Sequence, residues 1–186
     1  FPYTTLFRSL ETEIPDWELS SVRAKAKSLW EKELSIIELE GNETDKTTFY
    51  TALYHASLLP LNITDVNGQY PGFETGGDLA EGELHYHYFT PWDAFRTLHP
   101  LIHFINPHKG EQYLKSALRS YKIYGKLPEP TVMTSVSFSA IFADALAQGL
   151  DFDQALAFQG LEELILKPPY FRGEAMASYA ELGYVP

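Results

Sequence analysis

Apolar residues recur every three or four positions through most of the chain, and this spacing is typical of amphipathic helices that pack on one side. The pattern predicts about seven helices, at about residues 21–40, from 44 to before Pro60, within 90–105, and at about 106–124, 137–148, 151–166 and 173–182. Pro107 suits the first position of its helix, and Gly125 and Gly149 are typical helix ends. The chain should therefore be an all-α protein.

The same periodicity predicts which residues face the core. In the second helix the expected buried face is Phe49, Ala52, Leu53 and Ala56. In two later helices the expected buried residues are Leu114, Ala117, Leu118 and Tyr121, and then Phe138, Ile141, Phe142 and Ala145.

Residues 61–89 interrupt this helical pattern. Asn67-Gly68 is a strong tight-turn signal between short extended runs, and the alternating residues 85–88, HYHY, are typical of a strand. We expect a loop-rich β-hairpin inserted between helices, and a long irregular insertion of this kind is more often functional than decorative.

The stretch Thr90–Leu101, TPWDAFRTLHPL, carries strong helix signals. Thr90 is a candidate N-cap, and Pro91 suits the first helical position. Pro100 lies inside the pattern and lacks an amide proton, so it should bend or interrupt the helix.

Three side chains of this stretch could bind a sugar. Trp92, Asp93 and Arg96 fall within about one helical turn, and they offer an aromatic face, a carboxylate and a guanidinium. The plainer interpretation is a capped core helix that carries a surface ion pair. We take these three residues as the candidate substrate-binding positions.

Three sequence blocks occur in the order of a known family. They read FYTALYH at residues 49–55, DVNG at 65–68 and WDAFRTLHPL at 92–101. Together they resemble the catalytic domain of glycoside hydrolase family 92, and the resemblance runs from about Val22 to Pro186. It implies an incomplete (alpha/alpha)6 helical toroid, into which the loop-rich β-hairpin is inserted.

This resemblance also implies an activity. The family consists of calcium-dependent, exo-acting alpha-mannosidases that hydrolyse glycosidic bonds with inversion. The expected partner is then a mannose-containing glycan, with alpha-1,2 linkages as the expected bonds. A secreted or periplasmic location is implied in the same way.

An inverting glycosidase needs one carboxyl group as acid and a second as base. In the resembled family the acid lies in a Gly-Asn-Glu-Thr block after the stretch that reads KLP at residues 126–128 here. This chain instead continues with EPTVMTSVS at 129–137, several residues short. Glu129 is the nearest carboxylate and hence the candidate acid, while the family's base comes from a segment beyond Pro186. This piece alone should be inactive.

The missing block leaves other interpretations open. One is a degenerate carbohydrate-binding homologue that keeps the sugar pocket and lacks the catalytic acid. Another is a different helical-toroid glycosidase with its acid elsewhere.

Histidine pairs raise the question of a metal. His85 and His87 would share one face of a strand, and His99 and His103 one face of a helix, so two pairs could suit zinc. No third or fourth ligand has a telling spacing, and the plainer interpretation is aromatic-rich packing.

Calcium is implied by the resemblance alone. Oxygens of Asp65, Asn67 and Glu74 could reach a calcium ion, but the spacing of an EF-hand loop is absent. The calcium ligands therefore stay unassigned.

Composition narrows the class of partner. The chain has 186 residues, of which 45% are hydrophobic and 15% aromatic, and this suffices for the core of one domain. A net charge of −11 argues against nucleic acid or an anionic membrane surface, and it is compatible with a neutral sugar or a cation. No apolar run is long enough to span a bilayer. The chain has no cysteine, so disulfides are excluded and the compartment stays open. The oligomeric state does not follow from the sequence.

The two ends of the chain also carry signals. Residues 1–9, FPYTTLFRS, resemble the in-frame translation of a widely used DNA sequencing adapter, so we exclude them from the expected fold. Residues 10–186 are then expected to be a fragment of a helical-toroid glycosidase domain. The final LGYVP at 182–186 also matches a family block, and we expect the natural chain to continue.

Overall fold

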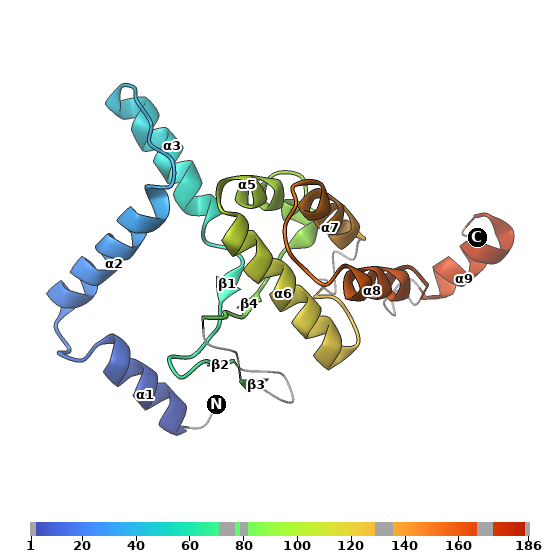
Figure 1. The fold of residues 1–186 in the computed structure, drawn as a ribbon, viewed down its shortest axis with the longest axis horizontal. Helices are drawn as coiled ribbons and strands as arrows, with labels where there is room; N and C mark the ends of the chain where they lie inside the picture. Colours follow the sequence, from blue (N-terminus) through green and yellow to red (C-terminus); the bar gives the residue numbers. More distant parts are fainter. Residues whose placement is uncertain (1–2, 71–76, 79–81, 129–135, 167–172, 185–186) are drawn as a thin grey trace. The chain divides into compact units, whose positions relative to one another are not determined.

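The computed structural model describes residues 3–70, 77–78, 82–128, 136–166 and 173–184. These residues are mostly helical and include two small two-stranded sheets, so the predicted all-α class with a β-hairpin insertion is confirmed. The chain divides into two compact units, Phe1–Tyr86 and His87–Pro186, and each is described by itself (Figure 1). Among the described helices, none is long and apolar enough to cross a membrane.

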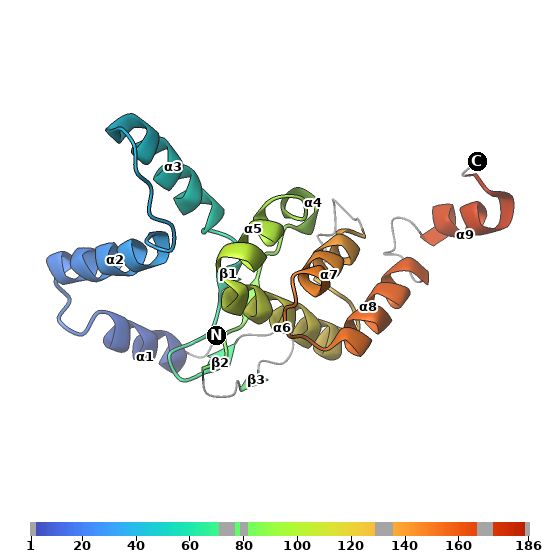
Figure 2. The ribbon, with the colours of Figure 1, turned by 45° about the horizontal axis from the view of Figure 1, so that its top comes forward.

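The first unit contains the helices α1 (Tyr3–Glu13), α2 (Leu19–Leu34) and α3 (Glu43–Ala56). α2 contacts α3, and Figure 1 and Figure 2 show residues 35–42, which connect the two helices, running alongside α3. The Tyr50 hydroxyl on α3 explains this path, because it donates to the Ile37 carbonyl at 2.9 Å and accepts from the Leu39 amide at 3.3 Å. The helix predicted to reach residue 40 therefore ends at residue 34.

This hairpin of α2 and α3 buries little of its apolar surface. Within α2, which is described throughout, no residue is buried, and Leu29 is exposed. On α3 only Leu53 is buried, whereas Phe49 and Ala56 are half-buried and Ala52 is exposed. The predicted buried face is thus wrong except at Leu53, because helical spacing identifies the apolar side but not whether a neighbour covers it.

Four short strands follow, β1 (Leu61–Asn62), β2 (Gln69–Tyr70), β3 (Gly77–Asp78) and β4 (Tyr86–His87). β2 and β3 pair antiparallel, with Gln69 opposite Asp78 and Tyr70 opposite Gly77, and β1 pairs with β4. The predicted Asn67-Gly68 turn is confirmed, since the Gly68 amide donates to the Asp65 carbonyl at 2.9 Å. Gly68 has a φ of 76°, a left-handed value that glycine adopts without steric cost.

The second unit holds the larger core. Its helices are α4 (Pro91–Ala94), α5 (Leu98–Ile105), α6 (Pro107–Tyr124), α7 (Ser137–Ala147), α8 (Gln154–Leu166) and α9 (Gly173–Leu182). α6 contacts α5 and α8, while α7 contacts α4, α5 and α8 (Figure 2). The helices from α4 to α8 therefore share one core.

Helix α6 has the limits that its caps predict. The Asn106 side chain accepts a hydrogen bond from the Lys109 amide at 3.2 Å, Pro107 begins the helix, and Gly125 ends it at a φ of 66°. Both predicted stripes in this unit are confirmed as buried, namely Leu114, Ala117, Leu118 and Tyr121 on α6, and Phe138, Ile141, Phe142 and Ala145 on α7.

The predicted central helix is broken into α4 and α5. Pro100 lies in the first turn of α5, where a continuous helix would bring its ring against the Arg96 carbonyl. The predicted interruption is confirmed, and it falls at residues 95–97, just before the proline.

Candidate functional site

Of the candidate sugar-binding residues, Trp92 and Asp93 lie in the second unit's first helix, and Arg96 follows its end. Thr90 precedes α4 and has a left-handed backbone, with φ 42° and ψ 52°. Its carbonyl accepts hydrogen bonds from the amides of Asp93 and Ala94 at 3.0 and 3.1 Å. Thr90 thus occupies the N-cap position as predicted, but its side chain makes no capping hydrogen bond to the described residues.

Helix α4 turns its candidate residues outward. Pro91 and Ala94 are buried, whereas Trp92 is 48% exposed and Asp93 is exposed as well. The helix is therefore held by one side and presents an indole and a carboxylate on the other.

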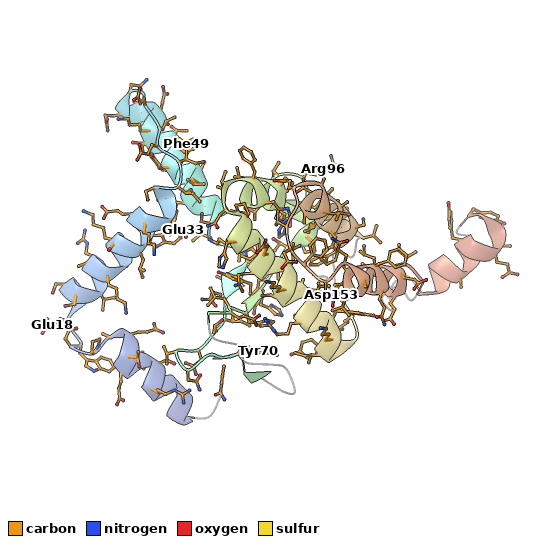
Figure 3. The ribbon with its side chains drawn as sticks, viewed as in Figure 1. Glu18, Glu33, Phe49, Tyr70, Arg96 and Asp153 are labelled. Carbon is orange, nitrogen blue, oxygen red and sulfur yellow. The ribbon has the colours of Figure 1, made fainter. Side chains whose placement is uncertain are left out.

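Arg96, labelled in Figure 3, follows in the break between α4 and α5 and is also exposed. Its guanidinium carbon lies 5.1 Å from the centroid of the Phe95 ring, within the range of a cation–π contact. Among the described residues Asp93 and Arg96 form no ion pair, so the alternative expectation of a surface ion pair is wrong.

Phe89 directly precedes the segment Thr90–Arg96, the corner at α4, and it is only 2% exposed. Its ring centroid is 6.4 Å from His99, 6.4 Å from Tyr113 and 5.8 Å from Phe138. The residues on either side of Phe89, Tyr88 and Thr90, have positive φ values of 60° and 42°. A non-glycine residue in such a conformation costs about 1–3 kcal/mol, and the surrounding packing must offset that cost.

A buried histidine pair lies next to Phe89, and its His99 ring packs against the Phe89 ring. His99 and His103 are each 1% exposed, so the prediction that they share one helix face is confirmed, and their ring centroids lie 6.2 Å apart. Nδ1 of His103 lies 2.7 Å from Oδ2 of Asp144 on α7. Neither ring nitrogen of His99, nor Nε2 of His103, makes a hydrogen bond of normal geometry with the described residues.

The protonation of His99 follows from this burial. Burial lowers the pKa of His99 from 6.5 to about 4, and repulsion from His103 acts in the same direction. The Phe89 backbone carbonyl and the Asp144 carboxylate oppose the shift without cancelling it. His99 is therefore neutral at physiological pH.

The described residues do not combine into a metal site. No group of three or more His, Cys, Asp or Glu side chains with suitable placement occurs among them, and this gives the zinc hypothesis no support. His85 is buried with its ring centroid 4.2 Å from that of Tyr70, as the plainer packing interpretation expects. Tyr70 is labelled in Figure 3.

The Asp65 carboxylate, one of the groups that could reach calcium, is already engaged by other donors. One oxygen of Asp65 lies 2.8 Å from the Arg8 guanidinium, and the other accepts hydrogen bonds from the Ser9 hydroxyl and the Val66 amide. These donors lower the pKa of Asp65, the Ser9 hydrogen bond most strongly, and they occupy the oxygens that a cation would need. We therefore derive no chemical step through calcium from these residues.

Two predicted residues cannot be placed. Glu129, the candidate acid, and Glu74, a candidate calcium ligand, lie outside the described residues.

Sequence reasoning missed two residues of this region. Phe89 gave no local signal, because a single phenylalanine between a strand and a helix has no periodicity. Asp144 did give one, since it is a carboxylate next to the apolar stripe that contains Ile141 and Ala145.

The sequence model described as the Glycosyl hydrolase family 92 catalytic domain matches residues 7–186. No curated protein matches the chain significantly.

Several solved structures are similar in fold. The family GH92 alpha-mannosidase BT3965 from Bacteroides thetaiotaomicron is 29% identical with a TM-score of 0.80, and the similarity covers 96% of this chain and 25% of that one. The GH92 family glycosyl hydrolase ccman5 is 26% identical with a TM-score of 0.73, covering 98% of this chain and 25% of that one. The inverting mannosidase BT2199 from Bacteroides thetaiotaomicron VPI-5482, 24% identical with a TM-score of 0.81, shares the fold over 98% of this chain and 27% of its own. The chain thus spans about a quarter of the length of these proteins.

Proposed function

Because the chain belongs to glycosyl hydrolase family 92, we propose that it is part of a catalytic domain that releases mannose from the non-reducing ends of alpha-linked glycans with inversion. The observation that carries this proposal is the corner at α4. Its buried side, Pro91 and Ala94, holds the helix, and its other side exposes Trp92 and Asp93. A related GH92 alpha-mannosidase, 29% identical to this chain, has been solved with mannoimidazole.

The three candidate residues have complementary chemistry for a pyranose. The half-exposed indole of Trp92 can stack on the apolar face of the ring. The Asp93 carboxylate can accept hydrogen bonds from sugar hydroxyls, and the Arg96 guanidinium can donate them. A neutral sugar also suits the net charge of −11, since it is not repelled by an acidic surface.

We propose that the chain by itself binds mannose without hydrolysing it. Inversion needs two carboxyl groups on opposite sides of the scissile bond. Glu129 is the candidate acid, although the segment around it departs from the family's Gly-Asn-Glu-Thr block. By the family resemblance, we expect the base to come from a segment beyond Pro186.

The finer features of the proposal follow the family resemblance. They are specificity for alpha-1,2 linkages, dependence on calcium, and a secreted or periplasmic location. None of them enters the chemistry that we assign to Trp92, Asp93 and Arg96.

A second function is favoured by one specific observation. Residues 129–137 read EPTVMTSVS where the family carries its acid block, which suits a homologue that binds glycans and has lost catalysis. Such a protein would keep the corner at α4, and even the full-length protein would bind mannosides without hydrolysing them.

The full-length gene product distinguishes the two functions. We expect it to release mannose from an alpha-1,2-linked mannobiose and from an aryl alpha-mannoside, but not from the matching alpha-glucoside or alpha-galactoside. Glu129→Gln should then abolish release from the mannobiose if Glu129 is the acid. Mannoside binding without any release would instead establish the binding homologue, and release from the glucoside or galactoside alone would refute both.

A further inference from the structure

We propose that Phe89 is a positioning residue that holds the turn Tyr88–Thr90 in its left-handed form and thereby sets where Trp92 and Asp93 lie. The proposal concerns the same corner as the proposed function and rests on it for its biological meaning. Its structural part stands on packing and backbone geometry alone.

Backbone geometry is the first argument. Two non-glycine residues, Tyr88 and Thr90, adopt positive φ values with a single residue between them. Residues other than glycine rarely adopt a positive φ, because their Cβ then approaches a backbone carbonyl. An unsupported segment of this sequence would relax to ordinary extended or helical angles, so something holds it in place.

Phe89 is the group that can do so. Tyr88 is 60% exposed, whereas the Phe89 side chain between the two strained residues is almost completely buried. Its ring packs against rings from three helices, namely His99 of α5, Tyr113 of α6 and Phe138 of α7. Because the ring is held from three sides, the backbone of Phe89 is held as well. The chain must therefore turn at the neighbouring residues, Tyr88 and Thr90, which take the positive φ values.

This anchoring reaches the candidate sugar contacts directly. The Thr90 carbonyl accepts hydrogen bonds from the amides of Asp93 and Ala94, so the orientation of Thr90 sets the axis of α4. α4 spans only Pro91–Ala94 and is too short to hold its own direction without an anchor. A turn that relaxes would therefore carry Trp92 and Asp93 away from the position that a sugar needs.

The test compares two pairs of variants of this 186-residue chain. Phe89→Leu removes the ring contacts. Phe142→Leu is its matched control, because Phe142 is also buried, at 4% exposed against 2% for Phe89, but its ring packs against Phe138 and Phe152. Tyr88→Pro forbids a positive φ at an exposed position, and Tyr88→Gly allows it without strain.

The readout is amide hydrogen exchange at Asp93 and Ala94, normalised to amides in the middle of α6. We expect Phe89→Leu and Tyr88→Pro each to raise these exchange rates about tenfold. Phe142→Leu and Tyr88→Gly should leave the normalised rates within about twofold of wild type. An equal increase in both phenylalanine variants would overturn the proposal, because the effect would then be a general loss of core packing. Unchanged rates in Tyr88→Pro would overturn it as well.

A parallel titration with methyl alpha-mannoside, followed by the Trp92 indole resonance, separates this inference from the proposed function. If wild type binds the mannoside, Phe89→Leu and Tyr88→Pro should weaken binding together with the change in exchange. If wild type does not bind it, the proposed function fails, while the exchange rates still decide whether Phe89 positions the turn.

Discussion

Nδ1 of His103 lies 2.7 Å from Oδ2 of Asp144, and this contact joins α5 to α7 beneath the candidate site. The histidine side chain is completely buried, whereas the carboxylate is 29% exposed and also accepts a hydrogen bond from the side-chain Nε2 of Gln148 at 2.9 Å. The contact fixes the ring of His103, which lies beside the His99 ring that packs on Phe89.

Removing the Asp144 carboxylate should therefore lower the stability of the second unit. Asp144→Ala leaves the buried Nδ1 of His103 without its acceptor, and the expected loss is about 1–3 kcal/mol in the free energy of unfolding. Urea denaturation followed by circular dichroism measures it. Gln148→Ala is the matched control, because it removes only exposed donor contacts, one to the same carboxylate and a longer one of 3.4 Å to the Pro100 carbonyl, and its effect should stay below about 0.5 kcal/mol. Equal losses in the two variants would contradict this assignment.

The buried histidine also makes stability depend on pH. The pKa of His99 is 6.5 when unfolded and about 4 in the fold, so the unfolded state binds more protons between these values. Stability is therefore complete above about pH 6.5 and falls as the pH drops toward 4, by up to about 3 kcal/mol. Urea midpoints at about pH 7 and pH 4.5 measure this loss.

His99→Phe is the control for that experiment. It keeps an aromatic ring of similar shape and removes the titrating nitrogens, so the pH dependence between these two values should become clearly shallower. His103 and Asp144 face His99 and remain in the variant. If the stability of His99→Phe fell with pH as steeply as that of wild type, the pH dependence would belong to His103 and Asp144 instead.

Close packing between α5 and α6 gives a further prediction. A Cβ added at Gly110 would lie 2.8 Å from Cδ2 of His103 and 2.9 Å from Cδ2 of Leu150, and the His103 ring is held by Asp144. Gly110→Ala should thus destabilise the protein by about 1–3 kcal/mol, despite the better helix propensity of alanine. Gly41→Ala meets nothing within 4 Å and should change stability by less than about 0.5 kcal/mol. Thermal unfolding of both variants tests this contrast.

The fold could be predicted where local signals decide it. α6 begins at Pro107 and ends before Gly125, as predicted, because its cap residues and its apolar stripe act within a few residues of each other. The end of α2 could not be predicted in this way. Ile36 and Ile37 continue its apolar spacing, yet the Tyr50 hydroxyl of another helix binds the Ile37 carbonyl outside helical geometry.

In the candidate site, too, local features could be predicted from the sequence, whereas long-range contacts could not. Trp92, Asp93 and Arg96 lie close together in the sequence, so their proximity, on α4 and in the break after it, could be predicted from the chain. Their support did not, because Phe89 depends on rings from three different helices and His103 depends on a carboxylate far along the chain. Whether the three residues bind a sugar stays a prediction.

The most direct test of the account is a titration of this chain with methyl alpha-mannoside, followed by nuclear magnetic resonance of the Trp92 indole, in wild type and Asp93→Ala. We predict saturable binding by wild type and binding weakened about tenfold or more in the variant, because a charged hydrogen bond is lost. Asp93 is exposed, so the variant should keep its unfolding free energy within about 0.5 kcal/mol. Methyl alpha-galactoside should shift the resonance in neither protein. Equal affinity of wild type and Asp93→Ala for the mannoside would contradict the assignment of this corner to sugar binding.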